Sequence, residues 1–270
     1  MKKPDETKPP NRYEQIIERI FMSHYTRGTE EFTVARDEII RHARELGVEL
    51  PKNLGDVIYS FRYRAELPKS VRSSAPKGKV WIIHPAGRAR YRFVAETPFD
   101  CTPNPNLADT KVPDATPGII AMYALTDEQA LLAKLRYNRL IDIFTGVTCY
   151  SLQSHLRTTL PEGDQLETDE LYIGVHRRGV HYVFPVEAKS ARERLGQVQI
   201  MQDLQLCRTR FAALVCRPVG AQFMEDDPIA LFEFEEADGR IRIVTEKHYR
   251  LVPRDQMSLD DLEAYKLRTD

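Results

Sequence analysis

The sequence predicts an α/β protein of two domains, in which a small α+β domain precedes a larger domain built on a mixed sheet. Three observations support this prediction. Residues 13–95 combine three helical patterns with an alternating hairpin pattern. Residues 119–270 alternate helical and strand patterns. Between them, residues 96–118 hold five prolines and two asparagines, which is typical of an irregular linker.

Composition excludes several classes of protein. The chain has 270 residues, of which 42% are hydrophobic and 29% charged, a balance unlike that of a disordered chain. No apolar run reaches the roughly 18 residues of a membrane helix, so we expect no membrane partner. Residues 1–12, MKKPDETKPPNR, predict a flexible tail without a secretory signal, and therefore a cytoplasmic protein. The four cysteines and seven histidines show no common metal-ligand spacing.

Charge is divided unevenly along the chain. The net charge is −1, but residues 1–95 carry 19 Lys/Arg and 12 Asp/Glu, whereas residues 96–270 carry 20 and 28. Such asymmetry indicates that the N-terminal half contacts a polyanion. The alternative is a basic face that is only solvated.

Three helices and a hairpin are expected in the N-terminal domain. Helical spacing of apolar residues predicts the first helix in RYEQIIERIFMSHY. The second helix is expected to begin with an N-cap at Thr33 and to stop at Gly47, and the third to begin at Asn53. KVWIIH and RARYRFVAE flank a turn at residues 85–87 and predict the hairpin. This order resembles a winged helix, a DNA-binding domain whose third helix commonly enters the major groove.

Basic residues gather at the end of the third helix, in the next loop and in the hairpin. Between residues 61 and 94 the only acid is Glu66, beside nine cations. The candidate DNA-binding residues are Arg62, Arg64, Arg72, Lys77, Lys79, Arg88, Arg90 and Arg92. The last three alternate, so we expect them on one strand face. Because each cation can neutralise a phosphate, the expected partner is double-stranded DNA.

The second domain is expected to open with a helix capped by Thr126 and Gln129 that runs to Gly146. A second helical stretch is expected around CYSLQSHLRT. LETDELYIGVHRRGVHYVFPVEAK then predicts two strands joined at residues 177–179. The remaining expected elements are a helix in ARERLGQVQIMQDLQLCRT, a strand in FAALVC, a hairpin turning at residues 238–239 and a short helix in SLDDLEAYKL.

One apolar strand, HYVFPVEAKS, ends on two opposite charges, Glu187 and Lys189. If the Arg-Arg-Gly turn before it is a three-residue loop, Asp169 faces Glu187 with about 4.5–5.5 Å between Cβ atoms. Two carboxylates this close repel unless one is protonated or a cation lies between them. In this register Glu167 lies opposite Lys189. A loop one residue shorter places Glu170 opposite Glu187 instead of Asp169. The sequence favours Asp169 but leaves the three acids open.

Two carboxylates at this separation suit Mg²⁺, which takes few protein oxygens and keeps waters or phosphate oxygens. Lys189 shares the strand face of Glu187, where an ammonium can orient an attacking water or hold the scissile phosphate. Metal-assisted phosphodiester hydrolysis requires these parts. The alternative is an exposed ion pair at the end of a strand.

An acid near the start of one strand, a hairpin, Glu-x-Lys ending the next strand and then a helix resemble the restriction-endonuclease-like nucleases, the PD-(D/E)xK superfamily. The resemblance covers residues 126–218 and implies an αβββαβ core with a mixed sheet. It implies that Asp169 and Glu187 bind the metal and that Lys189 is catalytic. The family usually has proline before the first acid, where this chain has Thr168.

Polar residues on neighbouring elements are candidate helpers of such a site. Gln199, Gln202 and Asp203 share one face of the helix that follows the Glu-x-Lys motif. The resemblance implies that Gln199 contacts the attacking water or the metal. The other candidate helpers are Gln153, expected on the helix before the hairpin, Glu167, Glu170 and Gln202. For each helper, a solvated surface position is the alternative.

The sequence therefore predicts a Mg²⁺-dependent DNA endonuclease, most consistent with a type II restriction or defence enzyme. A homodimer is expected to cut both strands, with the apolar faces of helix 126–145 and of the last hairpin as candidate interface elements. One alternative is a winged-helix DNA-binding regulator with a non-catalytic second domain, which never cuts DNA. Another is a structure-selective junction or repair nuclease, which prefers branched DNA.

Overall fold

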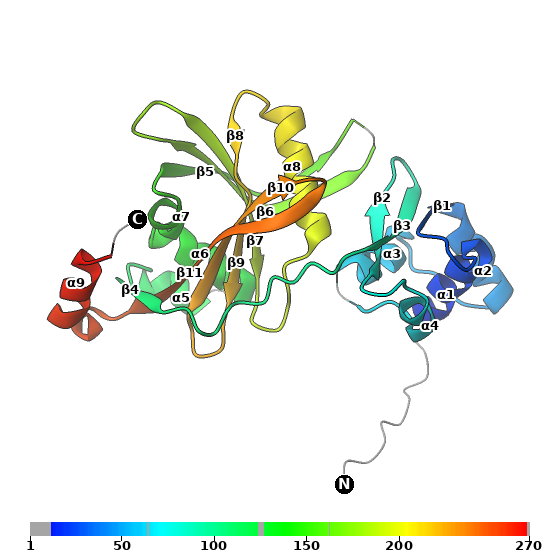
Figure 1. Cartoon of the computed structure of the whole chain (residues 1–270), viewed down its shortest axis with the longest axis horizontal. Helices are drawn as coiled ribbons and strands as arrows, with labels where there is room; N and C mark the ends of the chain where they lie inside the picture. The colour runs from blue at the N-terminus through cyan, green and yellow to red at the C-terminus, as the bar shows by residue number, and fades with distance from the viewer. Residues whose placement is uncertain (1–11, 64, 124–126, 162, 269–270) are drawn as a thin grey trace, which may run out of the picture. The chain divides into compact units, whose positions relative to one another are not determined.

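The chain forms two compact units, each with its own sheet (Figure 1). The first comprises residues 1–98 with 161–164, and the second comprises residues 99–160 with 165–270. The computed structural model describes residues 12–63, 65–123, 127–161 and 163–268, so the expected tail up to residue 11, Arg64 and Thr126 lie outside the described residues. Among the helices of the described ranges, none is both long and apolar enough to cross a membrane.

The first unit combines helices with a three-stranded antiparallel sheet of order β1-β3-β2. Its core joins the apolar face of the first helix to Trp81 and Phe93 of the sheet. The elements in chain order are α1 (Arg12–His24), β1 (Glu31–Ala35), α2 (Asp37–Leu46), α3 (Gly55–Tyr63), α4 (Lys69–Ser73), β2 (Val80–Pro85) and β3 (Arg90–Glu96).

The three expected helices and the hairpin are present, with two differences. Thr33, expected as an N-cap, lies in β1 opposite Arg92, and α2 begins only at Asp37. The β-branched pair at residues 33–34 fits the pleated strand better than a helix start. The short helix α4 was not expected, because five residues give no helical period. Asn53 does accept a hydrogen bond from the backbone N–H of Gly55 near the start of α3.

The second unit is built on an eight-stranded mixed sheet of order β4-β11-β10-β9-β7-β6-β5, with β8 beside β7. The pairs β7–β9, β7–β8 and β4–β11 are parallel, and the other pairs are antiparallel. The elements are β4 (Asp109–Pro113), α5 (Gly118–Tyr123), α6 (Asp127–Tyr137), α7 (Leu140–Thr145), β5 (Thr148–Thr159), β6 (Gln165–Val175), β7 (His181–Lys189), α8 (Gln197–Arg210), β8 (Val215–Cys216), β9 (Val219–Phe223), β10 (Ile229–Ala237), β11 (Arg240–Val252), a 3-10 turn (Arg254–Gln256) and α9 (Leu259–Lys266).

Helices cover both faces of this sheet. On one face α6 and α7 pack through a large core that includes Leu131, Phe184 and Leu231. On the other face α8 packs through Cys207 against Val183 of the sheet. Successive residues of β7, and of β6 from Glu170 onward, therefore alternate between an α6 side and an α8 side.

Several expected elements of this unit differ from the structure. The segment CYSLQSHLRT, expected as a helix, is the edge strand β5. The helix expected to run to Gly146 breaks at Arg139, whose φ is 51°, into α6 and α7. The linker expected at 96–118 contains β4, which pairs with β11. The strand expected in FAALVC shrinks to β8, and the longer strand β9 follows it.

The apolar surfaces expected to form a dimer interface are largely core. Leu131 and Leu135 of α6 are fully buried, and so are Leu231 and Phe232 of β10. On the hairpin, the exposed large apolar side chains are confined to Ile243 and Val244 of β11 among the described residues. These buried faces therefore stabilise the unit itself.

Candidate functional site

The hairpin of β6 and β7 sets the geometry of the site. The two strands pair in register down to Glu170 opposite Val186, which confirms the register expected for a three-residue loop. The pairing ends there, one residue short of Asp169 and Glu187. The Oδ2 atom of Asp169 accepts a hydrogen bond of 2.8 Å from the backbone N–H of Ala188. This hydrogen bond joins Asp169 directly to the Glu187-Ala188-Lys189 motif.

Four polar side chains meet on the α8 side of these strands. Lys189 Nζ lies 3.5 Å from Glu187 Oε2, and Gln199 Nε2 donates to the same oxygen at 2.6 Å. Glu187 is 1% exposed, and its Oε1 has no hydrogen-bond partner among the described residues. Asp203, also 1% exposed, accepts a 2.6 Å hydrogen bond from Thr168 Oγ1. Two buried carboxylates thus share one region with a single ammonium.

The electrostatics show an excess of negative charge. Burial, with Asp203 and Asp169 nearby, raises the pKa of Glu187 well above its usual range. Burial likewise raises the pKa of Asp169, and that of Asp203 to about 8. Burial works to lower the pKa of Lys189, but Glu187 and Asp169 outweigh it and raise that pKa. The carboxylates therefore keep Lys189 charged, but one ammonium does not compensate the negative charge of three carboxylates.

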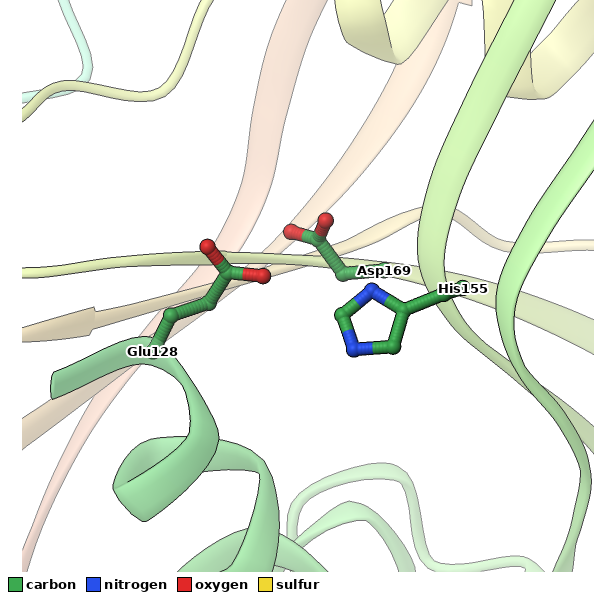
Figure 2. A group of neighbouring side chains, drawn as sticks. All are labelled: Glu128, His155 and Asp169. Carbon is green, nitrogen blue, oxygen red and sulfur yellow. The ribbon is translucent and has the colours of Figure 1, made fainter. Parts of the chain in front are cut away.

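Two further side chains, Glu128 and His155, lie near Asp169, and the sequence did not predict either of them. Glu128 lies in the first turn of α6, and His155 lies on β5 between the paired residues Ser154 and Leu156. One ligand atom each of Glu128, His155 and Asp169 lie within 4.8 Å of one another. Figure 2 shows the Glu128 carboxylate and the His155 ring beside the Asp169 carboxylate.

The structure distinguishes among the three acids that the sequence left open. Glu170 is fully buried on the α6 side, where Arg136 and Ser151 donate hydrogen bonds to it at 2.7 and 2.5 Å. Glu167 forms a 2.9 Å ion pair with Arg157. Of the three, Asp169 is the one whose carboxylate lies with Glu187 and Lys189.

The candidate helpers lie in different surroundings. Gln199 contacts Glu187, as described, and Gln202 is 8% exposed and donates to the backbone oxygen of Gln165. Together with the buried Asp203, they show that this helix face packs on the sheet and is not a solvated surface. Gln153 was expected on a helix but is exposed on β5, opposite Leu171.

The candidate DNA-binding residues of the first unit are partly paired with acids. Arg72 pairs with Glu66, Lys79 with Glu30 and Arg92 with Glu31, at 2.8, 2.8 and 3.9 Å. Two of these acids come from the start of β1, which the sequence places outside the basic stretch. The local excess of positive charge is therefore smaller than the sequence count indicates.

The remaining described cations are Arg62, half-buried on α3, and three exposed residues. Within the described ranges, Lys77, Arg88 and Arg90 form no ion pair. Arg88 lies in the turn before β3, so the expectation that it shares a strand face with Arg90 and Arg92 is wrong. The expected turn at residues 85–87 is displaced, because Pro85 belongs to β2 and the connection comprises the four residues 86–89, Arg88 among them.

Asp203→Asn is expected to stabilise the metal-free protein in a pH-dependent manner. The folded-state pKa of Asp203 is about 8 and its ordinary value is 3.8, so between these values the unfolded chain ionises more readily and wild-type stability falls as pH rises. Asparagine keeps an oxygen for Thr168 and carries no charge. Urea unfolding should show a gain near zero below about pH 4 that grows with pH to several kcal/mol above pH 8. A gain that does not change with pH would contradict the assignment.

The donor set fits a hard divalent cation. Carboxylate oxygens are the ligands such ions prefer, and the unpartnered Oε1 of Glu187 is a buried acceptor that a cation would satisfy. Buried like charges of this kind are stabilised by a counter-ion. No family model, no curated protein and no solved structure matches the chain.

Proposed function

We propose that this protein is a metal-dependent DNA endonuclease that hydrolyses phosphodiester bonds. The observation that carries the proposal is the meeting of Asp169, Glu187 and Lys189 where the pairing of β6 and β7 ends. A buried ion pair alone does not account for the surplus carboxylates, whereas a catalytic centre that binds a cation and a phosphate does.

Each residue of the centre has a role in this chemistry. Asp169 and Glu187 would hold Mg²⁺, which when bound supplies a Lewis acid and a water of lowered pKa. Gln199 fixes the Glu187 carboxylate through its hydrogen bond. Lys189 provides a positive charge for the phosphate oxygens as the water oxygen bonds to phosphorus. The attacking water gives up a proton to solvent, the P–O ester bond breaks, and the leaving oxygen takes a proton from solvent.

The element order agrees with the resemblance stated for the sequence. The succession of α6 and α7, β5, β6, β7, α8, the two-residue β8 and β9 supports an αβββαβ core in which β5 would be the first core strand. In the first unit, helices followed by the β2–β3 hairpin correspond to a winged helix, with α3 as the helix that would enter the major groove. A restriction or defence role, and a homodimer that cuts both strands, follow from this proposal as expectations.

The proposal is tested by incubating the purified chain with mixed-sequence duplex DNA and Mg²⁺, and by sequencing the ends produced. Recurrent ends at one sequence support a restriction or defence enzyme. Faster cleavage of a branched substrate than of a linear one supports a junction or repair nuclease. Binding to duplex without any cleavage, with or without Mg²⁺, would instead support a regulator and overturn the proposal.

Replacing the three exposed cations Lys77, Arg88 and Arg90 by alanine is expected to weaken duplex binding and its salt dependence. Each lost phosphate contact removes about 0.9 from the slope of log K against log salt on B-DNA, so the triple variant should lose up to about 2.7. Fluorescence anisotropy over a range of salt concentrations measures both quantities.

A matched control is the triple alanine variant of Arg72, Lys79 and Arg92, the cations that already pair with acids. These residues should contribute less, because each has a competing carboxylate. Equal slopes for wild type and both variants would place the duplex on another surface.

A further inference from the structure

We infer that Glu128, His155 and Asp169 form a cation position that favours the transition ion Mn²⁺ over Mg²⁺. The inference extends the proposed function. It rests on that function only through Asp169, which belongs both to this cation position and to the proposed catalytic centre. Glu128 and His155 come from α6 and β5, two elements that both precede the hairpin of β6 and β7 in the sequence. The position thus joins three elements of the second unit.

Their geometry suits a shared ion. One ligand atom of each of the three residues lies within 4.8 Å of the others. Among the described residues, no hydrogen bond or ion pair joins Glu128, His155 and Asp169 to one another. Ligand atoms about 2.1 Å from a common octahedral ion lie about 3–4 Å apart, so a small side-chain adjustment closes the set. Figure 2 shows the three side chains lying close to one another.

The three side chains differ in their exposure to solvent. Asp169 is 8% exposed, Glu128 is half-buried and His155 is exposed. The buried acid anchors the position, and the exposed histidine leaves one side open to water. A cation can therefore enter from solvent and keep sites for water or for a phosphate oxygen.

The backbone holds His155 in an uncommon conformation. Its φ is 48°, a value that residues other than glycine seldom adopt. The flanking residues Ser154 and Leu156 pair with Glu170 and Thr168 of β6, so the strand is fixed on both sides of the histidine. The imidazole is consequently carried next to Asp169 by a defined strand and not by a loose loop.

The nitrogen donor determines which ion is favoured. Carboxylates and water suit Mg²⁺ and Mn²⁺ alike, whereas imidazole is a good ligand for transition ions and a poor one for Mg²⁺. Two carboxylates with one imidazole therefore suit an ion that accepts both donors and retains several waters. Mn²⁺ meets these conditions, and a site made of Asp169 and Glu187 alone does not discriminate in this way.

The test is calorimetric titration of the DNA-free full chain with Mn²⁺ and, separately, with Mg²⁺. We expect wild type to bind Mn²⁺ at least about tenfold more tightly than Mg²⁺. His155→Ala should lose about tenfold in Mn²⁺ affinity and change Mg²⁺ affinity less than twofold. Pulsed EPR of bound Mn²⁺ should show the ¹⁴N coupling of imidazole in wild type and not in this variant. Glu128→Gln should weaken the binding of both ions.

His181→Ala is the matched control, because His181 is an exposed histidine on β7 at the opposite end of the same hairpin. It should change neither affinity. Equal affinities of wild type for the two ions, or an unchanged ¹⁴N signal in His155→Ala, would overturn the inference while leaving Mg²⁺-dependent cleavage as a separate result. His155-dependent Mn²⁺ binding without cleavage of any DNA would uphold the inference and overturn the proposed nuclease.

Discussion

Glu187→Gln is expected to make the metal-free protein more stable, by about 1–3 kcal/mol at pH 8, since removing a buried charge in surplus is often stabilising. Burial and neighbouring carboxylates raise the folded-state pKa of Glu187 above its ordinary value of 4.5. Wild-type stability is therefore lost as the pH rises above about 4.5, because the unfolded chain ionises first. Glutamine avoids this loss, so its advantage should grow with pH. Denaturant unfolding at pH 5 and pH 8 measures it.

The same substitution at Glu170 is the matched control. Glu170 is as buried as Glu187 and only a short distance away on the sheet, but it is held by Arg136 and Ser151 on the other face. Glu170→Gln should therefore lower stability, by about 1–3 kcal/mol, through weakened charge-assisted hydrogen bonds. If Glu187→Gln also lowers the stability of the metal-free protein, the carboxylate belongs to a structural ion pair.

Lys189→Met is expected to reduce cleavage by about 10²–10³-fold or more under single-turnover conditions, because the charge that faces the phosphate is lost. Methionine retains the length and apolar stem of the side chain. Duplex affinity should change little, since the cations proposed to bind DNA lie in the first unit. The assay is run with saturating metal, which offsets the carboxylates that Lys189 otherwise faces.

Lys247→Met provides the control for a lost lysine, because Lys247 is exposed on β11 of the same sheet. It should cut at the wild-type rate. Cleavage by Lys189→Met at a comparable rate would remove Lys189 from the catalytic centre.

The parts of the site that could be predicted from the sequence lie on one hairpin. The Arg-Arg-Gly turn and the alternating strands set the register of β6 and β7, and that register brings Asp169 to Glu187 and Lys189. Local turn chemistry and period-two alternation suffice for this, since both strands are contiguous in sequence.

The parts that were missed depend on distant elements. The segment of β5 looks helical because Leu152 and Leu156 are four residues apart, yet it is an edge strand whose side chains are mostly exposed and give no apolar alternation. Because this segment was predicted as a helix, the sequence did not predict that His155 lies next to Asp169. Glu128 resembled an ordinary acid in a first helical turn, and only the packing of α6 brings it to the site.

The measurement that tests the central claim most directly is single-turnover cleavage of an end-labelled duplex by wild type and Glu187→Gln, each in EDTA, in Mg²⁺ and in Mn²⁺. Both proteins should be purified in the same way and confirmed to be folded. We predict cleavage by wild type in either metal, no cleavage in EDTA, recovery of activity when metal is restored, and no cleavage by the variant. Cleavage in EDTA, or an equal rate for wild type and Glu187→Gln, would contradict a metal-dependent centre at these residues.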